Sequence, residues 1–264
     1  MANNVAGILF KQKENTMINN LLKGFGHIFS GLKLISQPGI RRFVIVPLGI
    51  NIALFGGATW YLFIKFDEWM TQLLPDFPDW LSWLETAVYW ILWPLFSVMI
   101  LLVIFYTFSF LANLIASPFN SLLAEKVENQ LTGKPLDTGP DFPTMEVIKR
   151  SIGSELGKLL YFIKWWALLF IVTLIPGINL AAPFLWVLFG AWMFSLEYLD
   201  YPMSNHGKFF KDINSQAMSK RSLSLGFGGG VMLLTSIPFI NLLAMPAGVA
   251  AATQLWVKHQ DHLS

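Results

Sequence analysis

The 264-residue chain contains no cysteine and little charge. Without cysteine it can form neither disulfides nor thiolate metal sites. Charged residues make up 13% of the chain, against about 25% in soluble domains. The net charge is only +2 and no long basic run occurs, so nucleic-acid binding has no support. Zinc-protease, serine-hydrolase and phosphate-loop motifs are also missing, so the sequence predicts neither an enzyme nor a cofactor.

Histidine offers little as a metal ligand in this sequence. The chain has four histidines, and they are dispersed. Only His259 and His262 are close enough in sequence to suggest a weak metal pair. A frayed polar tail is the simpler interpretation of these two residues, so we expect no bound metal.

Apolar side chains, in contrast, are abundant. Hydrophobic residues make up 55% of the chain, with 11 Trp and 23 Phe, and the mean hydropathy is +0.55. A soluble fold cannot bury so much apolar surface. The sequence therefore predicts an all-α integral membrane protein, whose helices satisfy their own backbone hydrogen bonds in lipid.

The N-terminal part contains a predicted amphipathic helix. We expect residues 1–16 to be a disordered extension, with Met1 or Met17 as the start, and residues 17–264 to form one membrane transport domain. Apolar residues then recur at helical spacing until Pro38-Gly39: Leu21, Leu22, Phe25, Ile28, Phe29, Leu32 and Ile35. This helix could lie in the membrane interface or pack on the bundle. The interface is favoured, because a membrane-length segment follows directly.

Two uncharged segments predict long transmembrane helices, over residues 43–64 and 87–116. The connection over residues 65–85 carries one basic residue and five acids, whereas residues 1–42 carry six basic residues and one Glu. The positive-inside rule therefore places the N-terminus in the cytoplasm. Residues 117–164 are expected to be a cytoplasmic segment containing amphipathic helices, one of them over residues 146–158.

The last hundred residues predict two helical hairpins, over residues 165–196 and 222–257. Their midpoints repeat: Ile175–Leu180 and Ile237–Leu242 both read I-P-x-I-N-L. Arms of about 11–17 residues, at ~1.5 Å per residue, are shorter than the bilayer core. We therefore expect each hairpin to enter the membrane and turn back inside it. The alternative is that each hairpin consists of two ordinary short spans with an external turn. Asn179 and Asn241 are predicted to cap the second arms.

Two adjacent arginines precede the first predicted span, directly after the Pro38-Gly39 break. Arg41 and Arg42 at a backbone turn suit an inorganic oxyanion. The alternative is that they only fix orientation or bind lipid headgroups, as the positive-inside rule would favour.

In these features the chain resembles the CysZ family of bacterial inner-membrane sulfate permeases. The resemblance extends over residues 21–256. The residues that carry it are Gln37–Phe43, Pro118–Glu125, Leu131–Gly133, both I-P-x-I-N-L tips and Leu196–Pro202.

The resemblance implies sulfate uptake for cysteine biosynthesis without an ATP-hydrolysing module. It also implies two long spans, two hemi-penetrating hairpins and a homo-oligomer, a dimer or larger. The family's sulfate motif corresponds to Gly39, Ile40, Arg41 and Arg42, with Ile40 in place of the usual Leu. Such a site would combine two guanidinium groups with backbone N–H groups freed at the turn.

Two functions follow as hypotheses. The first is a sulfate channel or permease of the bacterial inner membrane, with both termini in the cytoplasm and with sulfate and membrane lipids as partners. The second is a non-conducting membrane scaffold or assembly factor. Sulfate flux through the purified protein in liposomes distinguishes them.

Overall fold

The computed structural model describes residues 2–73, 119–136 and 144–259, together with residues 90–91, 93–95, 97–99, 101–102 and 106. These residues contain helices and turns but no strand, which confirms the predicted all-α class. The chain divides into two compact units, residues 1–44 with 120–264 and residues 45–119. Most of the predicted span 87–116, the acidic connection after residue 73 and the tail with His262 lie outside the described residues.

The first predicted span is confirmed as part of helix α2, Arg42–Leu73. Its segment Arg42–Leu62 is long and apolar enough to cross a membrane. Apolar side chains such as Ile52 and Trp60 are exposed on it, as expected for a surface that lipid covers. The helix continues beyond the apolar run, where Lys65 and Glu68 form an ion pair of 2.6 Å that raises the pKa of Lys65.

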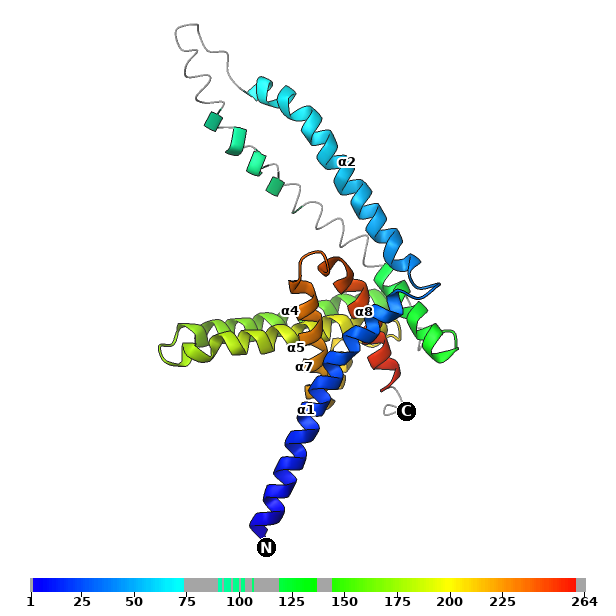
Figure 1. The fold of residues 1–264 in the computed structure, drawn as a ribbon, viewed down its shortest axis with the longest axis vertical. Coiled ribbons are helices and arrows are strands. Elements are labelled where there is room, and N and C mark those ends of the chain that lie inside the picture. The colour runs from blue at the N-terminus through cyan, green and yellow to red at the C-terminus, as the bar shows by residue number, and fades with distance from the viewer. Residues whose placement is uncertain are drawn as a thin grey trace. The chain divides into compact units, whose positions relative to one another are not determined.

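The first hairpin consists of α4, Thr144–Leu174, and α5, Ala182–Ser204, joined through the short 3-10 helix η2, Ile178–Ala181. Figure 1 shows α4 and α5 side by side, and Trp192 Nε1 donates to the Tyr161 hydroxyl at 3.1 Å between them. The predicted arm lengths were wrong. The amphipathic stretch 146–158 and the apolar run after it form one continuous helix, because no proline separates them. Both arms are therefore long enough to span a membrane.

The second hairpin is shorter and lies in the core of its unit. It consists of α7, Arg221–Ser236, and α8, Asn241–Val257, of 16 and 17 residues. Such helices measure about 24–26 Å, less than the ~30 Å of a bilayer core. The connecting helix α6, Phe210–Ser219, links α5 to α7. Many small residues of α8 are fully buried, among them Ala247 and Ala250–Ala252.

The N-terminal helix α1, Ala2–Ile35, packs on α7 and α8, as Figure 1 shows. Packing on the bundle, rather than the favoured interface position, is therefore the observed arrangement. A Cβ at Gly226 would lie 1.9 Å from the Leu21 carbonyl oxygen, so the two helices meet at backbone distance. The helix also includes residues 2–16, which we predicted to be disordered; extending an existing helix costs little where no proline intervenes.

The two hairpin tips share one backbone geometry, which supports the internal repeat. The third tip position has a positive φ in both, +87° at Gly177 and +65° at Phe239. In both tips the asparagine N–H donates four residues back, from Asn179 to Ile175 at 3.0 Å and from Asn241 to Ile237 at 2.9 Å.

The predicted asparagine caps were wrong. Helix α5 begins after Ala181 and α8 begins at Asn241 itself, and neither helix has a side-chain cap. The Asn179 side chain instead accepts a hydrogen bond from the Gly177 N–H at 3.2 Å, so it closes the turn. Asn179 cannot cap α5 because the 3-10 helix η2 lies between the tip and the start of α5.

Candidate functional site

The two arginines follow a tight turn between α1 and α2. Gly39 has a φ of +89°, a left-handed conformation that glycine adopts without strain. The N–H groups of Ile40 and Arg41 donate to the Gln37 carbonyl oxygen at 3.2 and 3.1 Å, so the turn itself uses them. The N–H groups of Gly39 and Arg42 have no backbone acceptor among the described residues. The turn therefore frees fewer donors than we expected.

The side chains of this turn divide between the core and the surface. The Ile40 side chain is fully buried in the core, so it anchors the turn and is not exposed to an anion. Arg41 and Arg42 are exposed. The Arg42 guanidinium lies 5.0 Å from the centre of the Phe43 ring, a cation–π contact that orients it. Within the described part of the chain, neither arginine forms an ion pair with a carboxylate.

A helix distant in sequence supports this turn. Residues 119–132 are helical, and the side chains of Leu123 and Val127 are fully buried. The amphipathic character predicted for this segment is confirmed, since Leu122 and Leu131 of the same helix are exposed. The Gln130 amide donates to the Gln37 side-chain oxygen, which fixes the residue before Pro38.

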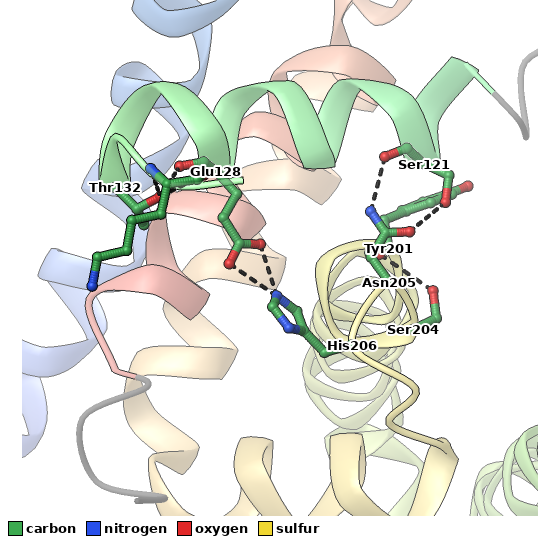
Figure 2. Close-up of polar contacts among 8 residues, drawn as sticks. Ser121, Glu128, Thr132, Tyr201, Ser204, Asn205 and His206 are labelled. Atoms are coloured by element: carbon green, nitrogen blue, oxygen red, sulfur yellow. Dashed lines mark hydrogen bonds and ion pairs between the residues drawn. The ribbon is translucent and has the colours of Figure 1, made fainter. Parts of the chain in front are cut away.

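The same helix is attached to the end of α5 at two points (Figure 2). Ser121 Oγ donates to Asn205 Oδ1 at 2.7 Å, and the Asn205 amide donates back to the Ser121 carbonyl at 2.9 Å. Two turns further on, His206 Nε2 lies 2.9 and 3.0 Å from the two carboxylate oxygens of buried Glu128. Sequence reasoning missed this pair, because its members are 78 residues apart.

Four charged residues form a second group between α4 and α5. Lys158, whose side chain is only 10% exposed, lies 2.6 Å from Asp200, 3.3 Å from Glu197 and 3.1 Å from Glu155. Two carboxylates at this position, Glu197 and Asp200, could bind a cation or pair with a basic side chain. The structure shows the ion pair, since Lys158 occupies the position that a cation would take.

No group of three or more His, Asp or Glu residues in the described ranges could hold a metal ion. His259 Nδ1 lies 2.8 Å from the Leu255 carbonyl oxygen. Its proposed partner His262 lies outside the described residues.

These observations define a class of protein. Three helical segments, Arg42–Leu62, Lys149–Leu174 and Ile178–Ser204, are long and apolar enough to cross a membrane. Glu128 and Asp200 each have a basic partner, whereas Arg41 and Arg42, at the start of α2, have no acidic one among the described residues. The chain is thus an all-helical integral membrane protein with exposed positive charge at the start of a membrane span.

Comparison with known proteins identifies the family. The family described as sulfate transporter CysZ/etoposide-induced protein 2.4 matches residues 27–246. The chain is 41% identical over 255 residues to "Sulfate transporter CysZ" of Pectobacterium atrosepticum, covering 96% of this chain and 91% of that protein. It is also 41% identical over 242 residues to "Sulfate transporter CysZ" of Pseudomonas paraeruginosa, covering 90% of this chain and 96% of that protein. The chain therefore belongs to this family, which confirms the resemblance seen in the sequence.

Proposed function

We propose that this chain carries sulfate across the bacterial inner membrane, as a channel or permease without an ATPase, and so supplies cysteine biosynthesis. The observation that carries the proposal is the family match, which includes the Pro38-Gly39 turn and both hairpin tips. Both relatives are named sulfate transporters, and the chain aligns with nearly their whole length. The family is one of transporters, not of enzymes.

We place the sulfate site at Gly39, Ile40, Arg41 and Arg42. The guanidinium groups of the two arginines would bind the dianion, and the N–H groups of Gly39 and Arg42 are available as further donors. Ile40 would hold the turn in place through its buried side chain. A conducting site must also release its ion, so we expect weak to moderate affinity.

We further propose that the hairpin of α7 and α8 does not cross the whole bilayer and that both termini are cytoplasmic. The support is the length of these helices, about 24–26 Å against a core of ~30 Å. The exposed apolar faces of α4 and α5 would contact lipid or another copy in a homo-oligomer.

Radiolabelled sulfate uptake into proteoliposomes tests the proposal. We expect flux through the wild-type protein and strongly reduced flux with Arg41→Gln/Arg42→Gln. Exposed charge-assisted hydrogen bonds contribute about 1 kcal/mol each, so losing both weakens sulfate binding roughly 30-fold. Lys33→Gln, which removes an exposed positive charge from α1, is the matched control and should transport normally.

Two results would contradict the proposal. Absence of flux under every gradient would favour the alternative, a non-conducting scaffold or assembly factor. Normal flux and normal sulfate affinity in the double variant would exclude the two arginines from the mechanism while leaving transport itself intact.

A further inference from the structure

A second concentration of positive charge lines a cavity on the side of α1. The cavity has a volume of about 730 Å³, and three parts of the chain contribute to it. Lys23 and His27 come from α1, Lys220 from the junction between α6 and α7, and Lys258 and His259 from the end of α8. Its volume lies in the range of about 300–1,000 Å³ that is typical of small-molecule sites.

The described lining of this cavity contains basic and neutral residues but no carboxylate. None of Lys23, Lys220 and Lys258 forms an ion pair with a described residue. Three ammonium groups around one concave surface produce a positive potential that attracts anions. The first turn of α7 adds to it, because a helix N-terminus carries partial positive charge.

The histidine in the wall responds to this environment. His27 is buried, and its Nδ1 lies 2.8 Å from Gln254 Oε1. Burial lowers the pKa of His27, the hydrogen bond to Gln254 opposes that effect, and the neighbouring Lys258 and His259 lower it further. Burial is thus the main reason that the imidazole stays neutral, and an anion in the cavity would offset the smaller effect of Lys258 and His259.

The walls of the cavity are held rigidly by close helix packing. A Cβ at Gly24 would lie 2.0 Å from the carbonyl oxygen of Leu223, a residue that itself lines the cavity. Helices α1 and α7 thus meet at backbone distance beside the site. A site whose walls are preformed loses little ordering entropy when a ligand binds.

We propose that this cavity binds an organic phosphate or sulfate monoester, taken either from a soluble metabolite or from an anionic lipid headgroup. The cavity is larger than a bare inorganic oxyanion requires, and three lysines suit a doubly charged ester group. It is separate from the Arg41–Arg42 turn. From His27 to the end of α1 at Ile35 is already about 12 Å along the helix axis.

The test uses the full-length protein labelled in histidine, with NMR titration of the imidazoles in detergent and in lipid nanodiscs. His27→Gln identifies the His27 signal among the four histidines. The soluble probe is glycerol 3-phosphate. The lipid probes are nanodiscs of phosphatidylcholine that contain phosphatidic acid, whose headgroup is a phosphate monoester, and nanodiscs of phosphatidylcholine alone. We expect bound phosphate to raise the pKa of His27, because it offsets the positive charge of Lys258 and His259.

The variants separate this site from the proposed sulfate site. Lys23→Gln/Lys220→Gln/Lys258→Gln should weaken glycerol 3-phosphate binding about tenfold or more, whereas Lys33→Gln and Arg41→Gln/Arg42→Gln should leave it unchanged. If the triple variant does not fold, the single exposed substitutions Lys23→Gln and Lys258→Gln, each with a smaller loss, replace it.

A His27 response to phosphatidic acid but not to glycerol 3-phosphate would support the site and identify lipid as the source of its ligand. No response to either probe, or an equal loss with Lys33→Gln, would overturn the proposal. Neither result bears on sulfate flux, which depends on the arginines.

Discussion

Gly228 lies where α7 approaches α5 at backbone distance, and enlarging this residue should separate the two helices. A Cβ at this position would lie 1.8 Å from the Ala191 carbonyl oxygen and 2.8 Å from the Ser195 backbone nitrogen. Both atoms belong to the backbone, so no change of rotamer relieves the clash. Ordinary carbon–oxygen contacts are about 3.3 Å or longer, so α5 must move by more than 1 Å.

The expected cost follows from two opposing terms. Alanine gains about 1 kcal/mol over glycine in helix propensity. Overpacking of a rigid contact costs about 3 kcal/mol. Gly228→Ala should therefore lower the free energy of unfolding by about 2 kcal/mol, which corresponds to a fall of about 4–8 °C in Tm.

Gly153→Ala is the matched control, because it makes the same substitution within helix α4, where a Cβ would meet no atom within 4 Å. We expect its Tm to be equal to that of the wild type or slightly higher. Thermal unfolding of the purified protein in detergent, followed by tryptophan fluorescence, measures both variants. Equal Tm values for the two variants would refute the close packing of α5 against α7.

Two further predictions concern the hairpin tips and pH. Phe239→Gly should raise the Tm by a few degrees, because it relieves about 1–2 kcal/mol of backbone strain at a positive φ and removes only an exposed side chain. Gly177→Phe should lower the Tm, because it introduces the same strain at the other tip. The opposite order of Tm values would contradict the shared tip geometry. The pKa of His27 is lowered from 6.5 in the folded state, so protonation of this imidazole favours the unfolded state. The contribution of His27 to the free energy of unfolding is therefore fully present above pH 6.5 and is lost as the pH falls through the lowered pKa. The Tm should therefore decrease from pH 7.5 to 5.5, and His27→Gln should make this decrease smaller; an unchanged pH dependence would exclude His27 as its cause.

Local patterns were sufficient to predict the all-α class and the positions of the described turns between helices. The uncharged run of α2 and the repeated I-P-x-I-N-L tips determine helices and turns through neighbouring residues alone. The Pro38-Gly39 turn was predicted for the same reason. The position of Arg41 and Arg42 directly after this turn indicated an oxyanion site, and the family resemblance then favoured sulfate as its ligand.

The supporting contacts could not be predicted in this way. His206 with Glu128 and Lys158 with Asp200 join residues 78 and 42 positions apart, and their pairing depends on how helices pack. The length of α4 was also misjudged, because a change from polar to apolar composition does not end a helix.

The sequence by itself determined that this is a helical membrane protein with two broken hairpins and an arginine pair at a turn, because periodicity, hydropathy and proline act over a few residues. Only the tertiary structure decided that α1 packs against α7 and α8 and that basic residues of all three regions line one cavity. The physical reason is that glycines such as Gly24 and Gly226 allow backbone contact between helices, and such contact depends on residues some two hundred positions away.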